Sequence, residues 1–154
     1  MRAISARRLL QCAWPSANHY VESFYGRLGG DDRGRTLPLR VRLHDIGLPS
    51  QLALEREVLA TLTRLPDEEN PTTGYHLEWA AAGGGPYPRF TGWLFLNRGQ
   101  DDGSSLLELE GTYTAPFGAL GAFFDAAIGK RIAESTAETL LADIAGQIEA
   151  AATT

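Results

Sequence analysis

The chain has 154 residues, of which 44% are hydrophobic and 21% are charged, and its formal net charge is -5. This length suits one hydrophobic core, so we expect residues 1–154 to form a single domain. The arginines are dispersed along an acidic chain. A nucleic-acid partner is therefore not expected, because such proteins gather positive charge on one surface.

The only cysteine is Cys12, which excludes an internal disulfide and a zinc site built from cysteines. The basic segment at residues 1–12 has no apolar run of the length that a signal peptide needs, because Arg7 and Arg8 interrupt it. No stretch approaches the roughly 18 apolar residues of a membrane span. We therefore expect a cytoplasmic protein without a membrane span, with Cys12 buried in a strand.

The first half of the chain combines strand and helix patterns. Residues 3–12 can form a strand, and residues 39–43 alternate between apolar side chains and arginine, which is typical of a half-buried strand. Between them, apolar residues recur at intervals of three and four, as in an amphipathic helix that Gly29 and Gly30 would end. These residues are Tyr20, Val21, Phe24, Tyr25 and Leu28.

Residues 52–65 have the composition of a helix, since Leu, Ala, Glu and Arg are strong helix formers. We nevertheless predict a strand here, because the neighbouring segments are hairpin-like. An antiparallel sheet also needs this segment to join the strand at residues 39–43 to the later ones.

The second half of the chain predicts three more strands followed by one long helix. The segments YHLEWAA, FTGWLFL and SLLELEGTY are rich in aromatic or branched residues and are separated by turn-forming residues. Pro116, Gly118 and Gly121 then mark a hinge. Residues 120–151 carry apolar residues in a four-residue register, with a kink or break expected at Gly129. The order is that of an α+β protein whose curved sheet buries one face against the helix.

Three motifs in this half carry a resemblance to a known family. They are Pro-x-Phe-x-Gly at residues 88–92, Leu-x-Leu-x-Gly-x-Tyr at 107–113, and Pro-x-Gly-x-x-Gly at 116–121. With them, the chain resembles a bacterial branch of the SRPBCC superfamily, which includes START-type and polyketide-cyclase-like domains. The resemblance implies a helix-grip fold, in which a curved antiparallel sheet of about six to seven strands wraps around a long C-terminal helix. It also implies an apolar cavity between sheet and helix.

Aromatic residues of the strands and apolar residues of the last helix are the candidate lining of this cavity, and we expect them to face one another. The set is Trp79, Trp93, Phe95, Tyr113, Phe124, Ile128 and Ile132. Apolar pockets with a few polar groups are the usual sites for small molecules. The same side chains would form an ordinary core if no cavity exists.

The sequence points to no catalytic residue, metal site or cofactor. His19, His44 and His76 lie on separate elements without the spacing of metal ligands. Glu108 and Glu110 alternate with leucines, so we expect them to point to solvent. No catalytic motif of the polyketide-cyclase members matches a position in this chain.

Three functions remain open at this point. The leading hypothesis is a binding module for a hydrophobic small molecule or lipid. An enzyme of the cyclase or aromatase type would use the same cavity and would need a polar group inside it that titrates near neutral pH. An interaction protein, acting through the convex sheet face or as a homodimer, would fill the cavity with its own side chains.

Overall fold

The computed structural model describes residues 2–26, 35–42, 55–65, 73–84, 87–114 and 126–152. The elements are β1 (Arg2–Leu10), α1 (Trp14–Val21), the π-helical turn η1 (Glu22–Gly26), β2 (Arg35–Arg42), β3 (Glu55–Arg64), β4 (Thr73–Ala81), β5 (Arg89–Arg98), β6 (Ser105–Thr114) and α2 (Ala126–Ala152). The predicted helix at residues 120–151 therefore begins, in the part described, at Ala126. The proposed hinge at Pro116, Gly118 and Gly121 lies outside the described residues.

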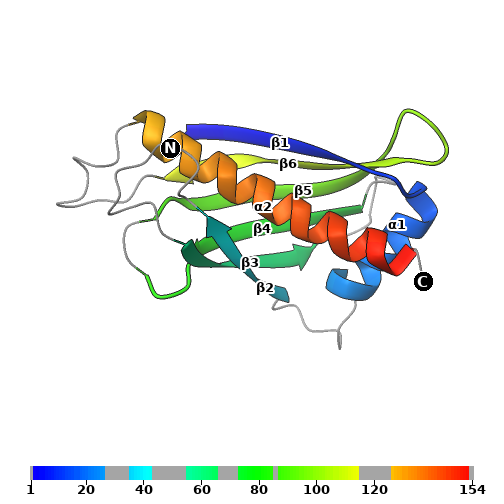
Figure 1. Cartoon of the computed structure of the whole chain (residues 1–154), viewed down its shortest axis with the longest axis horizontal. Coiled ribbons are helices and arrows are strands. Elements are labelled where there is room, and N and C mark those ends of the chain that lie inside the picture. Colours follow the sequence, from blue (N-terminus) through cyan, green and yellow to red (C-terminus); the bar gives the residue numbers. More distant parts are fainter. Residues whose placement is uncertain are drawn as a thin grey trace.

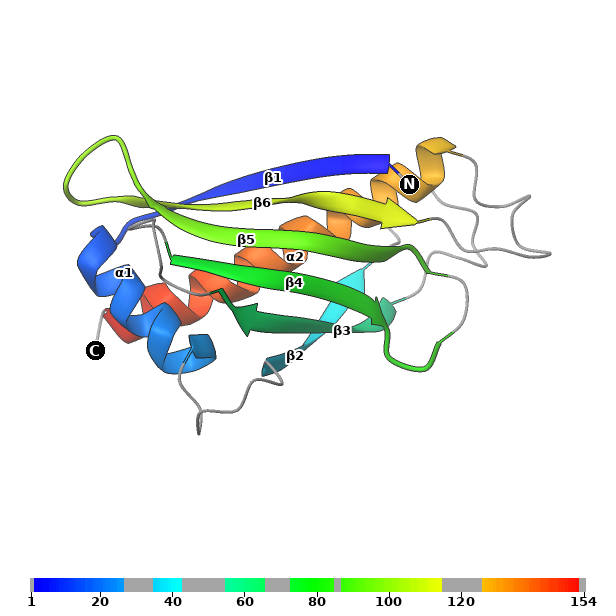
Figure 2. The same cartoon turned by 180° about the vertical axis from the view of Figure 1, so that it is seen from behind.

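The six strands form one antiparallel sheet in the order β1-β6-β5-β4-β3-β2. The edges are therefore β1 and β2, and Pro38 lies within the edge strand β2. Helix α2 runs diagonally across one face of this sheet, as Figure 1 shows, and Figure 2 gives the view from the sheet side. Both edge strands contact α2, so the sheet curves around the helix. This arrangement confirms the predicted α+β fold.

Residues 55–64 form β3 although their composition favours a helix. Val58, Ala60 and Leu62 are fully buried, whereas the residues between them are more exposed. The strand pairs with β2 on one side and with β4 on the other. Pairing on both edges and burial of one face thus override the local helix preference.

Helix α2 has 27 residues, which corresponds to about 40 Å, and it continues through Gly129, where the sequence suggested a kink or break. It buries one face at intervals of three and four residues, which is the pattern of a helix packed on a core. The buried positions are Ile132, Ala133, Thr136, Ala137, Leu140, Leu141, Ile144, Ala145 and Ile148.

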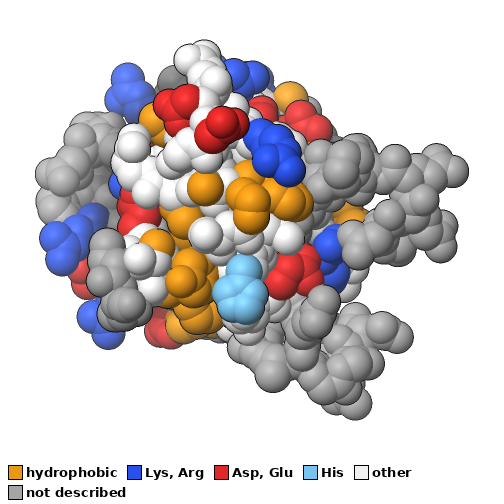
Figure 3. All heavy atoms as spheres, turned by 90° about the vertical axis from the view of Figure 1, so that its right-hand side faces the viewer, with side chains coloured by type: hydrophobic (Ala, Val, Ile, Leu, Met, Phe, Trp, Pro, Cys, Tyr) orange, Lys and Arg blue, Asp and Glu red, His pale blue; other side chains and the backbone are white. Residues whose placement is uncertain are grey.

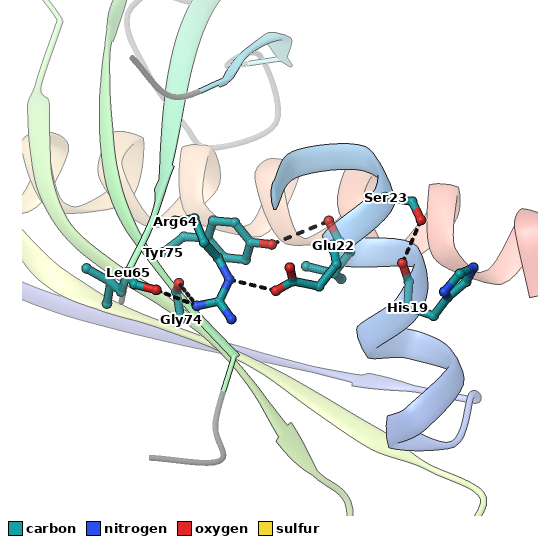
Figure 4. Close-up of polar contacts among 8 residues, drawn as sticks. His19, Glu22, Ser23, Arg64, Leu65, Gly74 and Tyr75 are labelled. Carbon is teal, nitrogen blue, oxygen red and sulfur yellow. Dashed lines mark hydrogen bonds and ion pairs between the residues drawn. The ribbon is translucent and has the colours of Figure 1, made fainter. Parts of the chain in front are cut away.

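Helix α1 and η1 close one end of the space between sheet and α2. Figure 4 shows Arg64 of β3 paired with Glu22 of η1 at 2.6 Å, while Tyr75 donates a hydrogen bond to the carbonyl of Val21 at 3.4 Å. Trp14 donates from Nε1 to the carbonyl of Leu96 at 3.0 Å. Figure 3 looks onto this end, where hydrophobic, charged and polar side chains are mixed. The contacts anchor α1 to the sheet and fill this end of the interior.

A pair of glycines makes room for an aromatic ring at the centre of the sheet. Gly92 and Gly111 lie directly opposite each other on β5 and β6. A Cβ atom on Gly111 would lie 2.7 Å from Cα of Gly92, and it would also meet the ring of Phe90. The ring of Phe90 therefore lies on bare backbone, which explains the glycines in two of the three sequence motifs.

Replacing Gly111 by alanine should lower the free energy of unfolding by about 1–3 kcal/mol, because the new methyl group has no room. Gly146 is the matched control, since a Cβ atom there meets nothing within 4 Å and the residue is exposed on α2. Gly146→Ala should raise the free energy of unfolding by about 1 kcal/mol through helix propensity. Urea denaturation measures both. Equal stability of Gly111→Ala and the unmodified chain would contradict the close packing of Phe90.

Candidate functional site

Three aromatic side chains of neighbouring strands form one end of the interior. Trp79 of β4 lies opposite Phe90 of β5, which in turn lies opposite Tyr113 of β6. All three are at most 3% exposed. The rings of Trp79 and Phe90 stack with their centroids 4.2 Å apart and an interplanar angle of 13°. We call Trp79, Phe90 and Tyr113 the aromatic wall.

The half of α2 nearest its N-terminus offers small residues to the interior. Gly129, Ala133, Thr136 and Ala137 are buried there beside the single larger residue Ile132, whereas leucine and isoleucine fill most of the buried positions after residue 139. A Cβ atom on Gly129 would lie 3.7 Å from Cε2 of Tyr113, so the tyrosine ring lies beside the helix at this glycine. The interior therefore has an aromatic end and a second end under α1. We call the second one the aliphatic end, because leucine and isoleucine supply most of the buried α2 residues there, beside the buried Tyr25 and Tyr75.

A hydrogen-bonded chain joins the aromatic end to α2. The Thr136 hydroxyl donates to the carbonyl of Ile132 at 2.7 Å, so the Tyr87 hydroxyl must donate to Oγ1 of Thr136. Burial raises the pKa of Tyr87 from 10.0 to about 12. Tyr87 therefore keeps its proton at neutral pH and acts as a hydrogen-bond donor.

Two polar atoms of the aromatic wall are buried without a hydrogen-bond partner among the described residues: Nε1 of Trp79 and the hydroxyl of Tyr113. Leaving such an atom unpaired costs about 1–3 kcal/mol, and few buried polar atoms in proteins are left so. The indole N–H can only donate, whereas the phenol can donate or accept. The aromatic end thus combines apolar walls with two unused polar groups.

Three of the residues predicted to line a cavity lie at this end. Trp79 and Tyr113 are on the face of the sheet that α2 covers, and Ile132 is buried on α2. Ile128 belongs to α2, but its side chain is outside the described part. Phe124 lies outside the described residues.

The expectation that Trp93 and Phe95 face the helix is wrong. Strand β5 buries Phe90, Leu94 and Leu96, so the alternation of the strand turns Trp93 and Phe95 to the outer face. Trp93 is 44% exposed. The two aromatic residues lie opposite Glu110 and Glu108, and residues directly opposite in a sheet share a face.

Two open grooves lie at the surface of the described part of the sheet. One, of about 510 Å³, crosses the edge strand β1 and is lined by Ala3, Ile4, Ser5, Trp93, Glu110, Gly111, Thr112, Lys130 and Glu134. The other, of about 500 Å³, crosses β3 to β6 and is lined by Leu59, Thr61, Glu78, Trp79, Ala80, Arg89, Phe90, Thr91 and Thr114. Their linings mix charged, polar and apolar side chains.

The described histidines and the cysteine lie apart from one another. His19 is exposed on α1, His76 lies on the outer face beside Trp93, and His44 is outside the described residues. Cys12 is buried as expected, but it lies just after the end of β1 and not in the strand. Burial raises the pKa of its thiol, and the negative charge of Glu149 raises it further. Within the described ranges no three His, Cys, Asp or Glu side chains are grouped to hold a metal ion. None of the described helices is long and apolar enough to cross a membrane.

Comparison with solved structures identifies the architecture. The Zhui aromatase/cyclase of a Streptomyces species superposes with a TM-score of 0.58 at 10% identity, covering 96% of this chain and 93% of that one. A START superfamily protein of Mycobacterium smegmatis gives 0.53 at 12% identity, covering 96% and 97%. A conserved protein of Geobacillus kaustophilus gives 0.54 at 14% identity, covering 96% and 93%. The chain has the START-like helix-grip fold.

At these identities the likeness concerns the helix-grip fold alone. No protein-family model matches the sequence, and no curated protein matches it. The site of this helix-grip protein must therefore be argued from its own residues.

Sequence reasoning missed three residues of the aromatic end. The sequence analysis names Phe90 only as part of a motif. Along β5, however, Phe90 is separated from Leu94 and Leu96 by even numbers of residues, so all three side chains lie on the same face. Tyr87 lies between two prolines, where no helix or strand periodicity marks it. Thr136 occupies the single gap in the apolar register of α2 at positions 128, 132, 140, 144 and 148, and this gap was the signal that could have found it.

Tyr87→Phe should change how stability depends on alkaline pH. Below pH 10 the phenol of Tyr87 is protonated in both the folded and the unfolded chain. As the pH rises from 10 to 12, Tyr87 loses its proton in the unfolded chain before it does so in the folded one. This difference lowers the free energy of unfolding by up to about 3 kcal/mol. The variant lacks this loss, and its unfolding free energy should therefore fall less steeply between pH 9 and 12. Parallel curves for the two proteins in urea titrations would contradict a buried Tyr87.

Proposed function

We propose that this protein binds a small, largely apolar molecule between the aromatic wall and the first half of α2. The observation that carries the proposal is the unequal construction of the interior. At one end the ring of Tyr113 lies beside Gly129, and most buried residues of α2 are small. At the other end most buried residues of α2 are leucine or isoleucine, and the hydroxyls of the buried Tyr25 and Tyr75 are hydrogen-bonded. Rings opposite small residues make a surface that a flat apolar molecule can contact with little rearrangement.

The closed end of the interior supports the same location. Val21 and Ala17 of α1 are buried, and the Arg64–Glu22 pair ties η1 to the sheet. The aromatic wall lies toward the opposite end, near the start of α2, where Figure 1 shows the N-terminus and the ends of β4 and β6. A ligand would therefore enter from the end away from α1.

The polar groups of the aromatic end support binding more directly than catalysis. An enzyme of the cyclase type needs a group that exchanges a proton near neutral pH. Tyr87, with a pKa of about 12, holds its proton at neutral pH, and its hydroxyl is hydrogen-bonded to Thr136. Of the similar structures, one is an aromatase/cyclase and one a START superfamily protein, and both share the fold with this chain.

A neutral apolar dye, N-phenyl-1-naphthylamine, should bind at about one molecule per chain with a rise in its fluorescence. Ala133→Met should weaken this binding at least about tenfold, because the longer side chain enters the space opposite the aromatic wall. The matched control is Ala145→Met, since Ala145 is equally buried on α2 but lies among the aliphatic residues. Both variants should lose about 1–3 kcal/mol of stability through overpacking.

Fluorescence titration measures the affinity, and chemical denaturation verifies that each variant is folded. Absence of dye binding to the unmodified chain would contradict the proposal. An equal loss of affinity in the two methionine variants would also count against it, because the loss would then reflect the lower stability of both variants and not the position of the ligand.

A further inference from the structure

The two unpaired polar atoms of the aromatic wall belong to one cluster. Trp79 and Tyr113 flank Phe90 on β4 and β6, so their backbones are two strand spacings, about 10 Å, apart. Neither Nε1 of Trp79 nor the hydroxyl of Tyr113 has a hydrogen-bond partner within the described ranges. The other described tyrosines of the interior differ, since the hydroxyls of Tyr25, Tyr75 and Tyr87 all have partners.

These atoms limit the chemistry of a molecule that would pair with them. The indole N–H requires an acceptor, and the tyrosine hydroxyl can donate to the same kind of atom. Both groups are neutral. A neutral oxygen such as that of a ketone, an alcohol or a phenol matches them, whereas an ionised carboxylate would pay a larger desolvation cost in an apolar interior.

Resting on the proposed function, we infer that the ligand is an apolar molecule with at least one neutral oxygen, which receives hydrogen bonds from Trp79 Nε1 and the Tyr113 hydroxyl. In the unfolded chain these two groups form hydrogen bonds with water, and the ligand oxygen replaces that water in the folded protein. A pure hydrocarbon of the same shape leaves both atoms unpaired and therefore binds more weakly than its oxygenated counterpart.

The test compares 2-acetylnaphthalene with 2-ethylnaphthalene, which have nearly the same shape and differ in one carbonyl oxygen. For each protein the affinity ratio of the two probes is measured, and the ratios are compared between variants, so that the water solubilities of the probes cancel. Tyr113→Phe and Trp79→Phe should each reduce the preference for the ketone by about 3- to 10-fold. Tyr25→Phe, which removes a hydroxyl paired with Gln147 at the α1 end, should leave the ratio unchanged.

A second measurement separates binding from folding. Because Tyr113→Phe removes an unpaired buried hydroxyl, its melting temperature without ligand should equal that of the unmodified chain or exceed it by about 2–4 °C. Tyr25→Phe should melt lower, since it loses a hydrogen bond of 2.6 Å.

The outcomes are distinct. If neither probe binds, the proposed function fails. If both bind but Tyr113→Phe and Trp79→Phe keep the ratio of the unmodified chain, the proposed function stands and the inference about the oxygen is wrong. Tighter binding of 2-naphthoate than of 2-acetylnaphthalene would overturn the assignment of a neutral oxygen. A lower melting temperature of Tyr113→Phe together with an unchanged ratio would show that the hydroxyl serves folding only.

Discussion

The contact between the ring of Phe90 and the bare backbone of Gly92 and Gly111 organises the interior of this protein. Because neither glycine carries a Cβ atom, the ring can lie on the strands themselves. Trp79 then stacks on the ring from β4, and Tyr113 lies opposite it on β6. The aromatic wall is thus a consequence of two missing methyl groups in the middle of the sheet. On α2, the missing side chain of Gly129 likewise leaves room for the ring of Tyr113.

The two ends of the interior differ in how their buried polar atoms are paired. The aliphatic end buries Leu140, Leu141, Ile144 and Ile148 almost completely, and burial of each such side chain contributes about 1.5–3 kcal/mol. The aromatic end retains polar atoms that folding leaves without partners among the described residues. Proteins commonly accept such local costs where a ligand is bound, because the site is built for the complex and not for the empty chain.

The fold was accessible from the sequence because its strongest signals are local. Alternation and turn residues defined the strands, the apolar register defined α2, and the motif glycines pointed to the helix-grip fold. Within residues 52–65, the strand predicted from the hairpin-like neighbours and the family resemblance is observed at residues 55–64, as β3, although the composition of the segment favours a helix.

The composition of the site was less accessible, because it depends on the pairing between strands. Trp93 and Phe95 were expected to face the helix, yet they pair with Glu110 and Glu108, whose alternation with leucines already indicated the outer face. Combining the two strands in register would have corrected the error. Thr136 and Tyr87 are brought together from positions far apart in the chain, a contact that no local pattern encodes.

The open edges of the sheet bear on how the molecule behaves at high concentration. An exposed edge strand is a template on which a second chain can add a strand, which is a route to fibres and precipitates. On β2, Pro38 lacks an amide hydrogen and so withholds one hydrogen bond from an incoming strand. On β1, the exposed side chains of Arg2 and Arg8 place positive charge along the other edge, whereas Arg7 pairs with Glu108 of β6. A second copy of the chain would present the same charges there, so electrostatic repulsion opposes the edge-to-edge pairing of two β1 strands.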